Sequence, residues 1–191
     1  EGLAPGIVAD AFIEVPGEDD ALPLAAGSAR VQWLARDARP HGEALIEAVE
    51  AWTAASRDVL ARAAAPRPQE LDDIDVDVEL LWDSPADAEG EFYAWIAGES
   101  QTVKVLRRLL VQGSGVDRKR VAFMGYWRAG QVEAASDSPD RAVSAITGAV
   151  RADTLRATVF FTAPPNREMR FWLNIRTAIR HVGFSRRTNM A

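Results

Sequence analysis

Two stretches decide the fold of this chain: Trp95-Ile96-Ala97-Gly98-Glu99 and Gly125-Tyr126-Trp127-Arg128-Ala129-Gly130. Each closes an apolar run with small residues and then presents a charged or aromatic side chain. A parallel β-strand delivers residues to a ligand crevice at its carboxyl end in this way. The segment between them, Ser100 to Val111, has the apolar spacing of an amphipathic helix. The region therefore predicts strand, helix, strand, with candidate ligand contacts at the two strand exits.

The rest of the chain predicts more elements of both kinds. Strands are expected at Ala11–Val15, Ala29–Leu34, Val78–Trp82, Phe92–Ala97, Lys119–Gly125 and Leu155–Thr162. Helices are expected at Glu43–Ala64, Ser100–Leu110 and Glu168–His181. Strands that alternate with helices predict an α/β fold with a mostly parallel sheet and right-handed crossovers.

Bulk composition excludes several classes of function. The 191 residues are 48% apolar and 26% charged, as in ordinary globular proteins. A net charge of -6 argues against nucleic acid as a partner, because phosphate binding needs a clustered basic surface. The chain has no cysteine and two histidines, so we expect no disulfide, no iron–sulfur cluster and no metal site.

Localisation also follows from what the sequence lacks. No apolar run approaches the roughly 20 residues that span a bilayer, so we expect no membrane span. The first residues show no basic-then-apolar secretory pattern. The cytoplasm is the expected compartment.

A resemblance to a known family sharpens this outline. The chain resembles the C-terminal, pyridine-nucleotide-binding half of siderophore-interacting proteins, flavin-dependent ferric-siderophore reductases of the ferredoxin–NADP reductase superfamily. The similarity runs from about Phe12 to Ala134, and the family usually has a second arginine where Ala129 stands. Its most specific parts are Ala94–Glu99, Val105–Leu110, Gly115–Arg118 and Val121–Gly130.

The resemblance implies a Rossmann-like nucleotide domain over residues 1–135, with helices on both faces of the sheet. It also implies that this domain is incomplete at its N-terminus, lacking the strand and Gly-Asp-Glu-Thr-like turn that normally open it. Residues 136–191 are then a basic extension of unknown role. Within them, Leu155–Phe161 is apolar enough to fold back onto the sheet in place of the missing strand.

By the same resemblance, the chain binds NADPH or NADH as part of a reductase that releases iron from a ferric siderophore. A nicotinamide gives two electrons and ferric iron accepts one, so a flavin must mediate between them. FAD is expected only if a flavin domain is supplied elsewhere. A flavin-domain partner or a homo-oligomer is therefore expected. The alternative hypothesis is a non-catalytic remnant or interaction module that has lost nucleotide binding.

Seven residues are candidates for binding the cofactor: Ala97, Gly98, Glu99, Tyr126, Trp127, Arg128 and Arg36. Small residues at a strand exit permit close approach of a ligand, and a helix N-terminus favours an anion. Tyr126 and Trp127 are suited to flank a nicotinamide or flavin ring, with Arg128 near a phosphate. Arg36 is placed to bind an adenosine 2′-phosphate.

Each candidate also has a structural interpretation, which stays open at this point. Glu99 can simply stabilise the first turn of a helix. The aromatic pair can cap the core, and Arg36 can be a solvated loop residue. His41 is interpreted as a capping or surface histidine rather than a general base. No catalytic residue is assigned, because the chain contains no nucleophile motif.

Overall fold

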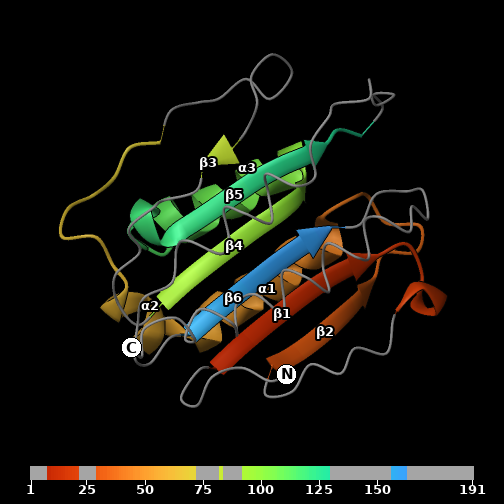
Figure 1. Cartoon of the computed structure of the whole chain (residues 1–191), viewed down its shortest axis with the longest axis horizontal. Helices are drawn as coiled ribbons and strands as arrows, with labels where there is room; N and C mark the ends of the chain where they lie inside the picture. Colours follow the sequence, from red (N-terminus) through yellow and green to blue (C-terminus); the bar gives the residue numbers. More distant parts are fainter. Residues whose placement is uncertain (1–7, 22–28, 72–81, 84–91, 130–155, 163–191) are drawn as a thin grey trace, which may run out of the picture.

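The computed structural model describes residues 8–21, 29–71, 82–83, 92–129 and 156–162, and for Trp82, Tyr126 and 156–162 it describes the backbone alone. Six strands form one sheet in the order β2-β1-β6-β4-β5-β3 (Figure 1). Their bounds are β1 (Val8–Val15), β2 (Ala29–Ala35), β3 (Trp82–Asp83), β4 (Phe92–Glu99), β5 (Val121–Trp127) and β6 (Arg156–Thr162). All neighbours are parallel except β3, which pairs antiparallel with β5 at one edge. The predicted α/β, Rossmann-like, mostly parallel sheet is confirmed.

The described helices lie on one face of this sheet (Figure 1). They are α1 (Glu43–Ala55), α2 (Arg57–Arg62) and α3 (Ser100–Arg108), with short turns η1 (Glu18–Asp20), η2 (Leu109–Gly113) and η3 (Arg118–Arg120). The prediction of one continuous helix over Glu43–Ala64 is wrong. The segment forms two helices, because the backbone of Ser56 leaves the helical region at φ -108° and ψ 21°. Serine is favoured at such a helix start. The helix predicted at Glu168–His181 lies outside the described residues.

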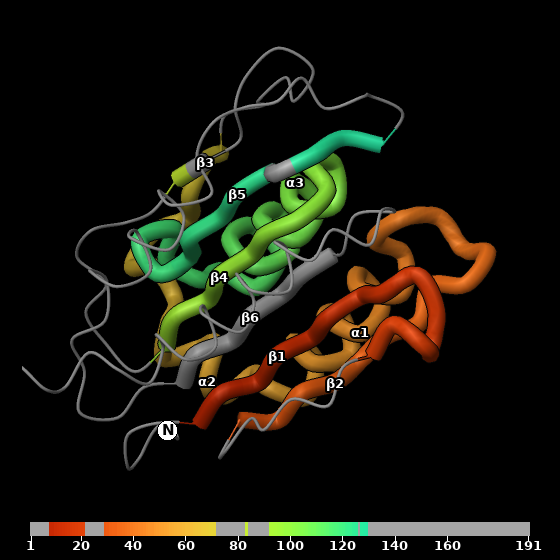
Figure 2. The backbone as a smooth tube through the Cα atoms, turned by 45° about the vertical axis from the view of Figure 1, so that its right-hand side comes forward, coloured from red at the N-terminus to blue at the C-terminus, as the bar shows by residue number. Residues whose placement is uncertain are grey.

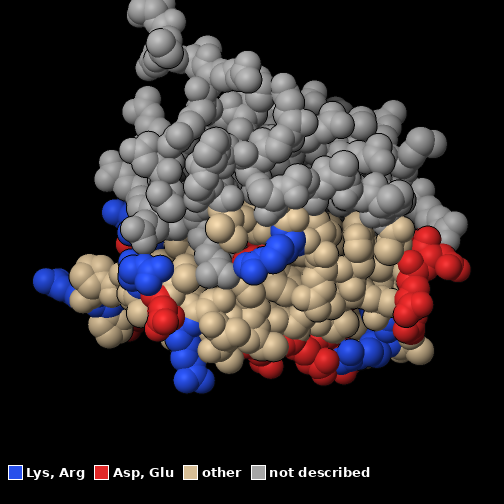
Figure 3. All heavy atoms as spheres, turned by 90° about the horizontal axis from the view of Figure 1, so that it is seen from below, with Lys and Arg blue, Asp and Glu red and all other residues tan. Residues whose placement is uncertain are grey.

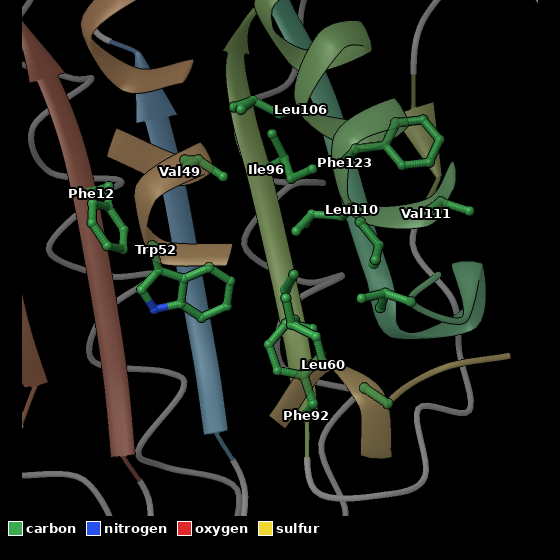
Figure 4. Close-up of a cluster of buried hydrophobic side chains, with 14 of the residues drawn as sticks. Phe12, Val49, Trp52, Leu60, Phe92, Ile96, Leu106, Leu110, Val111 and Phe123 are labelled. Atoms are coloured by element: carbon green, nitrogen blue, oxygen red, sulfur yellow. The ribbon is translucent and has the colours of Figure 1, made fainter. Parts of the chain in front are cut away.

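The core lies between the helices and the sheet (Figure 4). Alternate residues of each strand face the helices, because strand side chains alternate between the two faces. Phe12 of β1 meets Trp52 of α1 edge to face, and Trp52 stacks on Phe92 of β4. Both faces of β1 and β4 are buried from Ala9 to Val15 and from Phe92 to Glu99. This explains why both strands read as nearly continuous apolar runs.

Strand β6 lies in the middle of the sheet, between β1 and β4 (Figure 1), and Figure 2 shows β1 with β2 and β4 with β5 as the flanking pairs of strands. Val159 pairs with Ala11 on one side and with Trp95 on the other, in parallel register. The prediction that Leu155–Phe161 folds back onto the sheet is confirmed. One segment of the predicted extension, residues 136–191, is therefore part of the same sheet as the family-like region.

Five parallel strands bring their carboxyl ends to one edge of the sheet. The last residues of these strands are Val15, Ala35, Glu99, Trp127 and Thr162. Loops that follow parallel strands at this edge form the ligand crevice of open α/β sheets. This edge is therefore where the candidate residues have to be assembled.

Candidate functional site at the carboxyl edge of the sheet

The exits of β4 and β5 are side by side and closely packed against the start of α3. Gly98 pairs with Gly125, and Glu99 pairs with Trp127 after a register shift. Gly98 has φ 140°, a backbone conformation that glycine adopts readily and other residues rarely do. A Cβ on Gly125 would lie 2.6 Å from the hydroxyl of Ser100, which donates a hydrogen bond to the Trp127 carbonyl. At Gly125 the close approach is thus made by Ser100 of the protein itself, whereas the approach of a ligand at Gly98 stays a prediction.

Glu99 closes the N-terminus of α3. Its carboxylate accepts hydrogen bonds from the backbone N–H of Thr102 at 2.8 Å and from the Thr102 hydroxyl at 3.1 Å. The other oxygen accepts from the backbone N–H of Ala129 at 3.5 Å, just after β5. A carboxylate at this position stabilises the helix through its unpaired N–H groups and its dipole. Of the two interpretations of Glu99, this geometry matches the structural one.

Glu14, near the end of β1, does the same for α1. Its side chain is fully buried and accepts from the backbone N–H of Gly42 at 2.9 Å and of Leu45 at 3.2 Å. A guanidinium nitrogen of Arg36 lies 3.4 Å from the same carboxylate. Burial of a carboxylate is costly unless donors and a counter-charge satisfy it, and this set supplies both.

Arg36 follows β2 at the predicted place, but its side chain turns inward. Only 8% of that side chain is exposed, so Arg36 is not a solvated loop arginine. Its guanidinium faces Glu14 rather than open solvent. Any phosphate contact from Arg36 therefore requires it to share or leave this ion pair.

His41 and Trp127 connect the two halves of the edge. Their rings meet edge to face, with centroids 5.0 Å apart. Trp127 is 8% exposed, and its indole nitrogen finds no hydrogen-bond partner among the residues that the structure describes. The same is true of Nδ1 of His41. Buried polar atoms are nearly always satisfied, so two contacting rings whose nitrogens lack partners among the described residues mark this place as unusual.

Burial and the positive charge of Arg36 lower the pKa of His41 below its usual 6.5, against smaller opposing effects of Glu14 and Glu99. The imidazole is thus held in its neutral form by its surroundings. Because a neutral imidazole carries one proton, one ring nitrogen is an acceptor and the other a donor. His41 directly precedes Gly42, the N-cap of α1, but backbone N–H groups at this helix start donate to Glu14, so the carboxylate of Glu14 caps the helix and the capping interpretation of His41 is not supported.

The starts of α1 and α3 touch beside these rings. Gly42 has φ 83°, and a Cβ there would lie 2.1 Å from the hydroxyl oxygen of Thr102. Glycine is needed at this position both for the backbone conformation and for the space. The loop before α1 and the first turn of α3 therefore form one packed unit.

The other candidates have these positions. Ala97 lies in β4 and is 1% exposed. Tyr126 lies in β5, and its side chain is outside the described part of the structure. Arg128 follows β5 and is partly exposed. Six of the seven candidates thus lie at the exits of the adjacent strands β4 and β5, and Arg36 reaches the edge through its ion pair with Glu14.

Sequence reasoning missed Glu14, and it did not connect His41 to Trp127. A signal for Glu14 was present, because a carboxylate inside the apolar run Phe12–Val15 has to find buried donors. No comparable signal marks His41. Its partner lies far along the chain and is reached only when β1, β4 and β5 share one sheet.

Within the described ranges, no group of three or more metal-ligating side chains occurs and no helix is long and apolar enough to cross a membrane. On the face seen in Figure 3, positive and negative side chains are interspersed, and the acidic ones gather at one end. The described residues on that face form no continuous basic stripe for a phosphate backbone.

Comparison with known proteins places these features in a family. The family model described as siderophore-interacting protein matches residues 1–130. A search of curated proteins and of solved structures found no significant match. The matched segment covers more than half of the 191 residues and contains both strand exits and both capping glutamates. The chain belongs to the siderophore-interacting protein family.

Proposed function

We propose that this chain is the NAD(P)H-binding portion of a ferric-siderophore reductase, which passes electrons through a flavin to release iron. The family assignment supports a role in siderophore iron acquisition. The observation that carries the proposal is the edge where Gly98, at φ 140°, lies beside the β5 exit, and where the buried indole N–H of Trp127 has no acceptor among the described residues. A glycine at a strand exit and a hydrogen-bond donor beside it are features that nucleotide crevices use.

The residues at this edge fit a nicotinamide nucleotide in two respects. Gly98 is buried in β4 and has no side chain that would keep a sugar or phosphate away from its backbone. The indole N–H of Trp127 is a donor that has no acceptor among the described residues. The carboxamide oxygen of a nicotinamide can accept a hydrogen bond from it. Arg128, which is partly exposed next to it, adds positive charge at the same exit.

When bound, the nicotinamide supplies a hydride to a flavin held by another domain. The residues of this chain bind and orient the nucleotide. Glu99 fixes the backbone after β5 to the start of α3 through Thr102 and Ala129, and so holds the exit that carries Trp127 and Arg128. Trp127 limits water at the same place, because its ring is largely buried there against His41.

Titration of the purified chain with NADPH and with NADH, followed by calorimetry, tests the proposal. We expect saturable binding of at least one nucleotide, and weaker binding in Trp127→Phe. Trp95→Phe is the matched control, because it removes an indole from the middle of β4 rather than from the strand exit. Absence of heat with both nucleotides would remove the proposed function. Equal affinity of the two tryptophan variants would remove Trp127 from the site.

The choice between NADPH and NADH depends on Arg36 in this proposal. Its guanidinium faces Glu14 at 3.4 Å, so binding of a 2′-phosphate has to compete with that carboxylate. If Arg36 reads the 2′-phosphate, Arg36→Met lowers the affinity for NADPH and leaves the affinity for NADH unchanged. An equal loss for both nucleotides assigns Arg36 to holding the loop instead.

A second function, an interaction module without nucleotide binding, is favoured by one observation. The N-termini of α1 and α3 are natural anion sites. Here the carboxylates of Glu14 and Glu99 already accept hydrogen bonds from backbone N–H groups there. For this module, calorimetry detects neither nucleotide, while light scattering detects a dimer or a complex with a partner protein.

A further inference from the structure

The rings of His41 and Trp127 bring two complementary hydrogen-bonding groups to one place at the carboxyl edge. The indole N–H of Trp127 can only donate, whereas Nδ1 of a neutral His41 accepts when the ring proton is on Nε2. Neither nitrogen has a hydrogen-bond partner among the residues that the structure describes, and Trp127 is 8% exposed. Because the ring centroids are 5.0 Å apart, one small polar group can contact both rings.

Both rings are attached to backbone that is firmly held. His41 directly precedes Gly42, whose backbone N–H donates to the buried carboxylate of Glu14 at 2.9 Å. The backbone carbonyl of Trp127 accepts a hydrogen bond from the hydroxyl of Ser100 at 3.1 Å. The donor and the acceptor are therefore positioned before a ligand arrives, which lowers the entropy cost of binding.

The charges around the rings disfavour an anion there. The carboxylates of Glu14 and Glu99 are both buried and act electrostatically on His41. The guanidinium of Arg36 lies 3.4 Å from Glu14 and is thus already engaged. A negatively charged group beside His41 would be repelled by the two carboxylates. Burial and Arg36 also lower the pKa of His41, so the imidazole is neutral and can accept. The place suits a neutral ligand group.

A primary amide is neutral and carries a donor and an acceptor side by side. We propose that His41 and Trp127 together recognise the primary carboxamide of the nicotinamide ring. The amide N–H donates to Nδ1 of His41, and the indole N–H of Trp127 donates to the amide oxygen. This inference rests on the proposed nucleotide binding and makes His41 a specificity-determining residue that selects an amide over an acid or a ketone.

Three dinucleotides that differ only at this group test the inference by calorimetry on the full chain. The first is the natural nicotinamide dinucleotide. The second is its 3-acetylpyridine analogue, which keeps the oxygen and lacks the N–H donor. The third is nicotinic acid dinucleotide, which carries a carboxylate instead of the amide. We expect the amide to bind more tightly than the ketone by roughly three- to tenfold, the range that one neutral hydrogen bond adds. The acid should bind more weakly than the ketone.

Variants assign this preference to a residue. His41→Leu and His41→Phe both remove the acceptor nitrogen, and the second keeps an aromatic ring against Trp127. In either variant, the amide and the ketone should bind equally. Trp127→Phe should weaken both and keep their ratio, because both ligands carry the oxygen. His181→Gln is the control for loss of a histidine and should retain the preference. Each preference is a ratio within one variant, so a general loss of affinity cancels, and circular dichroism checks that each variant folds.

The outcomes separate this inference from the proposed function. If the unmodified chain binds the amide and the ketone equally, the inference is overturned and the proposed function stands. The same holds if the folded His41 variants keep the preference for the amide. If the unmodified chain binds none of the three dinucleotides, the proposed function itself fails.

Discussion

The imidazole of His41 meets the indole of Trp127 edge to face, with the ring planes at 81° and the centroids 5.0 Å apart. His41 belongs to the loop before α1, whereas Trp127 ends β5. The contact therefore joins the part of the edge built from β1 and β2 to the part built from β4 and β5. Protonation of His41 would therefore place a positive charge where these two parts of the edge meet.

This relationship predicts a pH dependence of stability. Burial and Arg36 lower the pKa of His41 in the folded chain below its usual 6.5. The unfolded chain then binds a proton more readily than the folded chain, so stability is full above the unfolded pKa and falls as pH drops below it. We expect the urea midpoint to decrease between about pH 7.5 and 5.5, the range in which histidine titrates.

The second histidine of the chain provides the control. His41→Leu should flatten the dependence of the urea midpoint on pH, whereas His181→Gln should preserve it. A dependence that persists unchanged in His41→Leu assigns the effect to another group.

Glu14 is predicted to be a large contributor to stability. Glu14→Gln leaves the guanidinium of Arg36 buried without its counter-charge and weakens the acceptor for the α1 N-terminus. Removal of one partner of a buried ion pair costs about 3–5 kcal/mol. Urea unfolding at neutral pH measures this loss.

Glu50→Gln changes the same residue type on the exposed side of α1 and should leave the free energy of unfolding within about 0.5 kcal/mol. The double variant Glu14→Gln with Arg36→Met should recover part of the loss, because it removes the unpaired charge. Similar stability of Glu14→Gln and Glu50→Gln contradicts the role of the pair.

The sequence predicted the elements well and the bonding of the site only in part. The exits of β4 and β5 were predictable because small residues after an apolar run are a local signal. The inward turn of Arg36 was not, because it depends on Glu14, a carboxylate on another strand. For β6, the sequence predicted an apolar segment able to join the sheet. Its position between β1 and β4 was not predictable, since these strands lie far away in sequence. The break between α1 and α2 at Ser56 was not predicted, because a single serine stands out little among the many alanines of this segment.

Strand β6 provides the next prediction, because it is hydrogen-bonded on both sides. Val159→Pro removes a backbone donor from the central ladder, where proline is not tolerated. We expect faster hydrogen exchange in both β1 and β4, measured by mass spectrometry on the full chain. Val159→Ile keeps the donor and the branched shape and should retain the original protection. Unchanged exchange in both strands would mean that β6 does not hold them together.

The final prediction separates backbone strain from steric clash at two glycines with similar conformations. Gly115 has φ 73° with nothing within 4 Å of an added Cβ, whereas Gly42 has φ 83° with the Thr102 hydroxyl 2.1 Å away. Gly115→Ala should therefore cost only the left-handed conformation, about 1–2 kcal/mol. Gly42→Ala should cost clearly more in urea unfolding, because the starts of α1 and α3 must separate and the Thr102 bond to Glu99 is disturbed. Equal costs would show that the two helix starts can move apart freely, and the edge would then be far less fixed than the contacts of His41, Glu14 and Glu99 imply.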